Sequence, residues 1–122
     1  LEEILTGYLA GRKAPELLIE GFGSFHERVV FLNAEPSPQA AELVRGLAQR
    51  LKGLPWLDFG KNDGGTKLHA TLMYAKTNRI FKEAFALLSA HRPRFEALLD
   101  NVSILKKENG AWSIYREYKL EA

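Results

Sequence analysis

Apolar positions recur along the chain with two different periods, which separates predicted helices from predicted strands. The spacing of one helix face links the residues Leu1, Ile4, Leu5, Tyr8 and Leu9. The same spacing returns after Ser37-Pro38, a pair that favours a helix start, and continues to Gly53. A third helix is expected to begin at Asn78, as its cap, and to end before Pro93. We therefore predict three amphipathic helices.

Short runs of β-branched and aromatic residues between the helices predict strands. We expect them at Glu16–Phe25, 29–32, 67–75, 94–107 and Ala111–Lys119, with the first two pairing as a hairpin. Asn109-Gly110 is a strong hairpin signal between the last two strands. Asp100-Asn101 interrupts the alternation of strand 94–107 and predicts a bulge or bend there.

The order of these elements indicates an α+β fold, in which helices cover a mostly antiparallel sheet. The chain has 122 residues, of which 46% are hydrophobic and 26% are charged. These values are ordinary for a globular protein and suit a single domain over residues 1–122.

Composition and charge exclude several classes of function. The chain has no cysteine, which excludes disulfides, thiolate catalysis and cysteine-based zinc sites and suits a cytoplasmic location. No apolar run reaches membrane-spanning length, so we expect no membrane partner. The net charge of +2 and the isoelectric point of about 8.9 are only mildly basic. They fit a small anionic substrate or a single nucleic-acid end better than a protein that coats nucleic acid.

The strand 67–75 carries the most informative polar residues. Because side chains alternate faces along a strand, His69 and Thr71 point to one side, and the even-numbered residues point to the other, which helices can cover. The imidazole can transfer a proton near neutral pH, and the hydroxyl can donate a hydrogen bond to a phosphate oxygen. Neither group needs a metal or another cofactor. The alternative is a half-exposed strand with two polar residues that have no function.

The context of this pair resembles the two-histidine phosphoesterase superfamily, which includes 2′-5′ RNA ligase-like proteins and cyclic phosphodiesterases. The resemblance rests on the Gly-rich segment 21–25, the strand 29–32, a helix, the strand with His69 and Thr71, another helix, and a final hairpin with Trp112. The hallmark of the family is two His-x-Thr/Ser motifs on strands that face each other across a cleft between two similar lobes. The resemblance implies such a bilobal fold, with His69-Ala70-Thr71 as the second motif.

This chain departs from the family because it carries one such motif rather than two. His26 and His91 are not followed by Thr or Ser at the required position. In the family the first motif precedes a helix like the one at Leu1, and Leu1 already lies within a helical pattern. We therefore expect an N-terminally incomplete fold, the C-terminal portion of a two-histidine phosphoesterase. Alternatively, the first motif has been lost, or another chain supplies it, as in a homo-oligomer.

The resemblance also implies a reaction, namely metal-independent hydrolysis or ligation at an RNA end or on a cyclic nucleotide. The reacting bond would be a 2′,3′-cyclic phosphate or a 2′-5′ linkage. One histidine takes a proton from the attacking group, the other protonates the leaving oxygen, and the threonines hold non-bridging oxygens. We expect His69 to be the base in hydrolysis and Thr71 to hold the phosphate. The alternatives are an inactive domain that binds RNA or nucleotides, and a structural domain with a covered His69.

Other residues are candidates for supporting roles. Phe25 and Tyr74 are candidates for stacking on a base, although Tyr74 has the parity of the even-numbered strand residues, which favours a core position. Lys67 and Met73 share the His69 face, and Lys67 is a candidate for attracting phosphate. Arg28 and Lys76 are weaker candidates for the same role.

The remaining polar and aromatic residues are expected to be structural. We expect Phe22 and Trp112 in the core, His26 in a surface loop and His91 near a helix C-terminus, with no metal site among the histidines. The Gly-rich loop 61–67 leads into a strand rather than a helix, which favours a turn over a phosphate-binding loop.

Overall fold

Helices and antiparallel strands alternate along the chain in the computed structural model, which describes residues 1–57 and 68–122. The elements are α1 (Glu2–Leu9), β1 (Glu16–Phe25), β2 (Val29–Pro36), α2 (Pro38–Lys52), β3 (Leu68–Tyr74), α3 (Asn78–Ser89), β4 (Arg94–Leu98), β5 (Asn101–Glu108) and β6 (Ala111–Lys119). The predicted α+β class with antiparallel pairing is confirmed.

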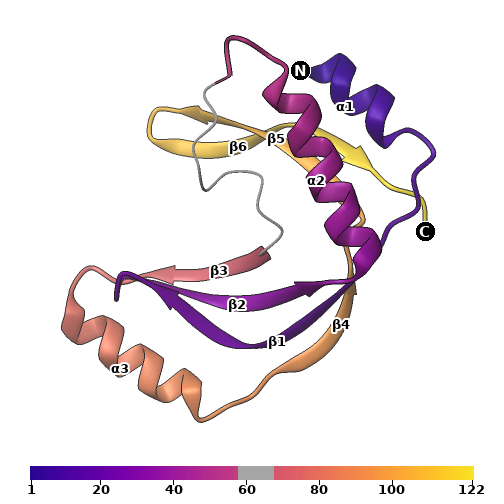
Figure 1. The fold of residues 1–122 in the computed structure, drawn as a ribbon. Helices are drawn as coiled ribbons and strands as arrows, with labels where there is room; N and C mark the ends of the chain where they lie inside the picture. Colours follow the sequence, from indigo (N-terminus) through magenta and orange to yellow (C-terminus); the bar gives the residue numbers. More distant parts are fainter. Residues whose placement is uncertain (58–67) are drawn as a thin grey trace.

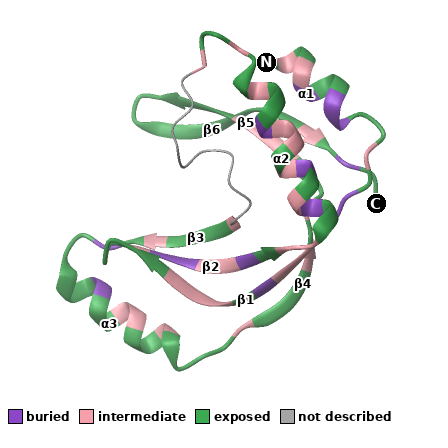
Figure 2. Cartoon of the chain, in the orientation of Figure 1, coloured by how far each residue is buried: buried purple, intermediate pink, exposed green. Residues whose placement is uncertain are grey.

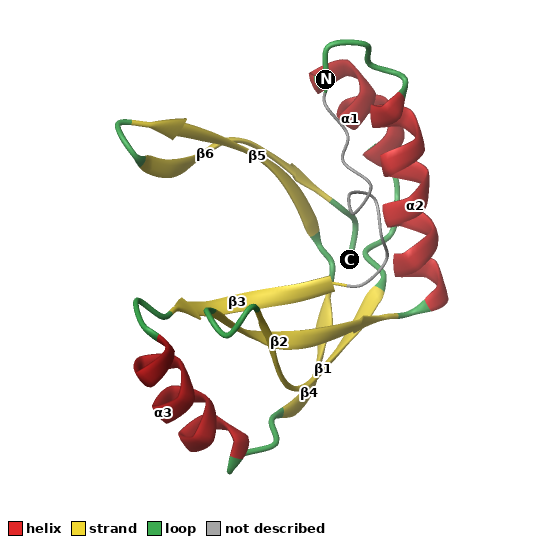
Figure 3. Cartoon of the chain, turned by 60° about the vertical axis from the view of Figure 1, so that its left-hand side comes forward, coloured by secondary structure: helices red, strands yellow, loops and turns green. Residues whose placement is uncertain are grey.

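Two sheets form the framework of the fold. A four-stranded antiparallel sheet has the order β3-β2-β1-β4, and β5 pairs with β6 in a separate hairpin. α3 lies on one side of the larger sheet, whereas α2 and the β5–β6 hairpin lie on the other side (Figures 1 and 3). The larger sheet therefore has one face toward α3 and one face toward the hairpin.

The hydrophobic core is divided in the same way. One buried cluster joins α1, α2 and the C-terminal part of the chain through Leu5, Tyr8, Leu9, Ala14, Leu43 and Leu120. The other cluster, Val30, Ala75 and Phe81, lies between the larger sheet and α3. The outer part of the β5–β6 hairpin is exposed instead (Figure 2). The prediction that Trp112 lies in the core is wrong, because it is 64% exposed at the end of the hairpin. Phe22, also predicted in the core, is half-buried.

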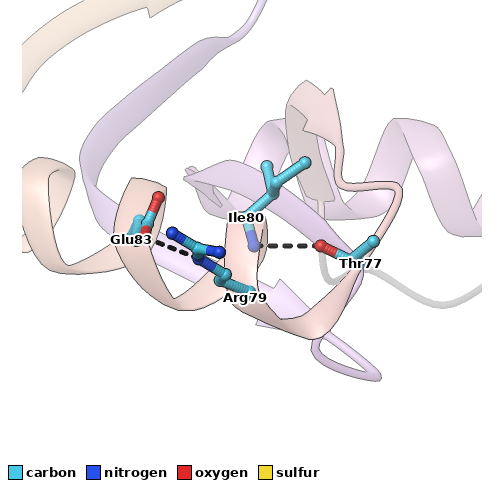
Figure 4. A network of polar contacts seen from close by, with 4 residues as sticks. All are labelled: Thr77, Arg79, Ile80 and Glu83. Atoms are coloured by element: carbon cyan, nitrogen blue, oxygen red, sulfur yellow. Dashed lines mark hydrogen bonds and ion pairs between the residues drawn. The ribbon is translucent and has the colours of Figure 1, made fainter.

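Capping side chains define where two helices begin. The Ser37 hydroxyl accepts a hydrogen bond from the Ala40 amide at 3.2 Å, as the Ser37-Pro38 signal predicts. In α3 the predicted cap was wrong by one residue, because the Thr77 hydroxyl accepts from the Ile80 amide at 3.2 Å (Figure 4). The backbone of Thr77 is extended, with φ −136° and ψ 160°, whereas Asn78 is already the first residue of the helix.

The prediction of one strand over 94–107 was wrong. β4 ends at Leu98 and pairs with β1, whereas β5 begins at Asn101 and pairs with β6. The link between them is held by backbone hydrogen bonds, from Leu99 to the Pro15 carbonyl at 2.8 Å and from Leu120 to the Asp100 carbonyl at 2.7 Å. The expected bend at Asp100-Asn101 is therefore the point at which the chain passes from one sheet to the other.

The hairpin turn at Asn109-Gly110 is confirmed. Both residues have positive φ, 51° and 79°, as a two-residue turn between twisted strands requires. None of the helices in the described part of the chain has the length and apolar composition needed to cross a membrane.

Candidate active site

His69 and Thr71 lie side by side on the face of the larger sheet that points away from α3. In the pairing of β2 with β3, His69 lies opposite Asn33, and Thr71 lies opposite Phe31. Val30, the neighbour of Phe31, points the other way, into the buried cluster beneath α3. Both His69 and Thr71 are exposed. The structural-domain alternative, which predicts a covered His69, is contradicted on this point.

Cross-strand pairing arranges the residues of this face in three rows, because directly opposed residues point to the same side. The outer row contains Phe25, Val29 and Tyr74. The middle row contains Gly23, Phe31 and Thr71. The third row contains Asn33 and His69.

Two phenyl rings contact the imidazole of His69. The ring centre of Phe25 lies 5.0 Å from that of His69 in an edge-on arrangement of 85°, and the ring centre of Phe31 lies at the same distance. Phe25 and Phe31 also contact each other, with 4.5 Å between ring centres. These contacts restrict the orientation of the imidazole while leaving the side chain exposed to a substrate. Phe25, predicted to line the site, lies beside His69.

Gly23 makes room for the ring of Phe31. A Cβ atom at Gly23 would lie 2.5 Å from Cε1 of Phe31 and 3.0 Å from Oδ1 of Asn33. Real Cβ contacts are essentially never this short, so any larger residue at Gly23 must displace the ring. Because Phe31 is 3% exposed, the ring has little free space to move into. The position of His69 therefore depends on the absence of a side chain on β1.

A bulge in β3 changes the direction of the residues after Thr71. Phe31 pairs with Thr71 and Val30 pairs with Met73, which leaves Leu72 without a partner. Met73 consequently packs with the cluster beneath α3, and its predicted place on the His69 face is wrong. Tyr74 moves to the His69 face and is 75% exposed, so its expected core position is wrong as well. The bulge instead supports the other reading of Tyr74, as a residue that lines the site.

The expectation that helices cover the opposite face of β3 is met only in part. Met73 packs against the cluster that includes Phe81 of α3, but Ala70 is exposed and Leu72 is 48% exposed. The reason is that α3 packs on β1 and β2 rather than on β3.

The polar groups of the site are available to a ligand. Within the described part of the chain, neither the His69 imidazole nor the Thr71 hydroxyl has a hydrogen-bond partner. The described residues contain no group of three or more His, Asp or Glu side chains that could hold a metal ion. The chemistry that this face offers is proton transfer by an imidazole and hydrogen bonding by a hydroxyl.

The other candidates lie elsewhere or outside the described residues. Lys67 and the loop 61–67 fall outside the described part of the chain. Arg28 and Lys76 are exposed near the β1–β2 turn and the start of α3. His26 is exposed in the β1–β2 turn with φ 52°, and His91 is exposed after α3, as predicted.

Sequence reasoning missed Gly23, Phe31 and Asn33 as parts of this face. A usable signal was present, because Asn33 is a polar residue within the apolar run of β2 and has the same parity as Phe31. Pairing that run antiparallel to β3 brings Asn33 opposite His69.

Comparison with known protein families identifies the family of this chain. A family model described as the 2′-5′ RNA ligase superfamily matches residues 1–111. The chain belongs to this family. The family is part of the two-histidine phosphoesterase superfamily, so the resemblance drawn from the sequence is confirmed. A search of curated proteins finds none that is significantly similar to the chain.

Membership of the 2′-5′ RNA ligase superfamily indicates which class of chemistry to expect of this chain. The superfamily is generally one of phosphoesterase and ligase enzymes, and the family acts on RNA. An exposed imidazole and an exposed hydroxyl on neighbouring positions of one strand are the groups such chemistry uses.

Proposed function

We propose that His69 and Thr71 form half of an active site that hydrolyses or ligates phosphodiester bonds at RNA ends without a metal ion. The substrate is a 2′,3′-cyclic phosphate or a 2′-5′ linkage. The observation that carries this proposal is that both side chains are exposed on one open face of the sheet. Thr71 lies opposite Phe31 there, and His69 lies opposite Asn33. We also propose a cytoplasmic location, which suits the lack of cysteine.

The two side chains have different roles in this reaction. Nε2 or Nδ1 of His69 accepts the proton of the attacking water or hydroxyl in hydrolysis and returns a proton in the reverse direction. The Thr71 hydroxyl donates a hydrogen bond to a non-bridging phosphate oxygen, where negative charge grows in the transition state. Phe25 and Phe31 hold the imidazole against the strand, and Tyr74 offers an exposed ring for stacking on a base.

The mechanism requires a second imidazole opposite His69, to protonate the leaving oxygen. Residues 1–122 contain one His-x-Thr tripeptide, so the second histidine must come from another segment or another chain. The side of the sheet on which His69 lies also carries the β5–β6 hairpin (Figures 1 and 3). We propose that the opposing histidine approaches from this side, either from the same protein or from a second copy in a homo-oligomer.

The single His-x-Thr motif also favours one alternative, a domain that binds RNA or nucleotides without catalysis. A proton-transfer group typically contributes about 10²–10⁴-fold in rate, so one histidine without its partner makes a poor catalyst. Both proposals predict binding at the same face, and only the first predicts turnover.

A substrate panel with product analysis tests the proposal. The full-length protein is incubated with 2′,3′-cyclic mononucleotides, with short RNA containing one 2′-5′ linkage, and with the same RNA linked only 3′-5′. We expect cleavage or sealing of one of the first two substrates and no reaction with the third. Binding without turnover of any substrate would favour the inactive binding domain, and neither binding nor turnover would contradict both proposals.

A further inference from the structure

One hollow on the molecule begins beside Asn33, the cross-strand partner of His69. It has a volume of about 600 Å³, and its lining includes Glu20, Asn33, Ser89, His91, Arg92 and Arg94. His69 and Thr71 are not among its lining residues. The hollow is therefore a neighbour of the His69 face and is distinct from it.

The course of β1 explains why the sheet is open at this place. β4 pairs with β1 only from Glu16 to Glu20, and the chain enters the sheet at Arg94, the first residue of β4. The register of β1 against β2 shifts between Ile19 and Phe22, so that Glu20 and Gly21 form a bulge near Asn33. Gly21 has φ 73°, and an added Cβ there would lie 3.8 Å from Nδ2 of Asn33. The Asn33 amide thus borders the bulge and the hollow.

The charged residues that line the hollow are Arg92, which lies between α3 and β4, Arg94 of β4 and Glu20 of β1. Arg94 is paired with Glu20, with 2.7 Å between Nε and Oε2. Arg92 is exposed and forms no ion pair with any described residue. The hollow therefore contains one compensated arginine and one arginine that can receive an anion, together with the hydroxyl of Ser89 and the imidazole of His91. A guanidinium that pairs with no described residue, beside a hydroxyl and an imidazole, is suited to a phosphate group.

We propose that this hollow binds a phosphate of the RNA strand next to the bond that reacts at His69 and Thr71. Asn33 connects the two sites, because directly opposed residues in antiparallel strands lie about 4.5–5.5 Å apart between Cα atoms. A strand held at Thr71 continues over Asn33 and the Glu20–Gly21 bulge, and Arg92 contacts its next phosphate. The proposal rests on the function proposed above, and it makes the preferred substrate a short RNA strand and not a mononucleotide.

Two substitutions in the hollow are expected to act in opposite directions. Arg92→Ala removes a cation that pairs with no described residue and should weaken RNA binding roughly ten- to a hundredfold, the size of a hydrogen bond to a charged group. It should also reduce the slope of log K against log salt concentration by about 0.7, the value for one phosphate contact on a single strand. Glu20→Gln removes the carboxylate that compensates Arg94 and should tighten binding. A merely structural role for Glu20 predicts no gain.

The control is Arg79→Ala, which changes the net charge by the same amount. Arg79 lies at the other end of α3, is exposed, and pairs with Glu83 at 3.3 Å (Figure 4). If Arg92 acted only through the general attraction between a basic protein and RNA, Arg92→Ala and Arg79→Ala would weaken binding equally.

The test measures binding of a fluorescent six-nucleotide RNA with a 2′,3′-cyclic phosphate end to full-length protein carrying His69→Ala, so that the probe is not consumed. We expect weaker binding with Arg92→Ala, tighter binding with Glu20→Gln, and no comparable change with Arg79→Ala. Equal effects of Arg92→Ala and Arg79→Ala, or no gain with Glu20→Gln, would overturn the proposal. Turnover of the cyclic mononucleotide by the protein with an intact His69 tests the proposed function separately, because that substrate does not reach the hollow.

Discussion

The ring of Phe31 occupies the space above Gly23, on the strand next to its own, and the imidazole of His69 rests against that ring. A side chain at Gly23 and the ring of Phe31 exclude each other. The orientation of the candidate catalytic residue is therefore set two strands away from it. Gly23, which has no side chain, is therefore part of the site, because it leaves room for the ring of Phe31.

Gly23→Ala should consequently lower both stability and activity. Displacing a buried ring typically costs about 1–3 kcal/mol, and a shift of about 1 Å at a reacting group costs up to about 10²-fold in rate. Chemical denaturation and the rate of phosphodiester turnover measure the two effects.

Gly7→Ala is the matched control for this change. A Cβ atom at Gly7, within α1, would meet nothing within 4 Å. We expect this variant to raise the free energy of unfolding by about 0.5–1 kcal/mol, through helix propensity, with an unchanged rate. A Gly23→Ala variant with normal turnover would show that Phe31 does not position His69.

Tyr74→Leu tests whether this exposed ring stacks on a base of the RNA. Because the side chain is 75% exposed, we expect the free energy of unfolding to change by no more than about 0.5 kcal/mol. If the ring stacks on a base, RNA binding weakens by about 1–3 kcal/mol. Phe95→Leu serves as the binding control. Phe95 is an exposed aromatic residue on β4, and its cross-strand partner Ile19 lies opposite Ala34, so Phe95 points to the other face of the sheet. Normal RNA binding by a folded Tyr74→Leu protein would contradict stacking of this ring on a base.

The contact between α1 and α2 depends on a second glycine. The Tyr8 hydroxyl donates a hydrogen bond to the Leu43 carbonyl at 3.0 Å, and a Cβ atom at Gly46 would overlap that hydroxyl. Tyr8→Phe should cost about 0.5–1.5 kcal/mol, and Gly46→Ala about 1–3 kcal/mol. In the double variant the overlapping oxygen is gone, so the combined cost should be less than the sum. Additive costs in denaturation experiments would contradict this packing.

Removal of metal ions should leave activity unchanged. The proposed reaction uses an imidazole for proton transfer and hydroxyl groups for charge stabilisation, and neither role requires a metal ion. Turnover is measured after dialysis against EDTA, and then after addition of Mg²⁺, Mn²⁺ or Zn²⁺. Loss of turnover with EDTA and recovery with one of these ions would require a different mechanism.

Features determined by neighbouring residues could be predicted from the sequence. The bounds of β1, the Ser37 cap of α2 and the turn at Asn109-Gly110 all depend on local backbone preferences, and all three are as expected. The sequence also predicted the strand that carries His69 and Thr71. It predicted that the two side chains lie side by side, because this placement depends only on the alternation of side chains along one strand.

Features determined by distant partners could not be predicted in this way. The bulge at Leu72 exists only in the register of β3 against β2, and it reverses the faces of Met73 and Tyr74. The break at Leu99 separates two strands that pair with segments far apart along the chain. Strict alternation fails at both places because it describes one strand and not a pair of strands.

The most direct test of the central claim compares two histidine substitutions in the full-length protein. His69→Ala removes the proposed proton-transfer group, whereas His26→Asn changes an exposed histidine in a turn where φ is 52°, a conformation that Asn tolerates. The measurement is the rate of turnover of a 2′,3′-cyclic phosphate or a 2′-5′-linked RNA, with the fold of each variant checked by circular dichroism. We predict a loss of about 10²–10⁴-fold for His69→Ala and a normal rate for His26→Asn. A normal rate in a folded His69→Ala protein would contradict the assignment of this face as the active site.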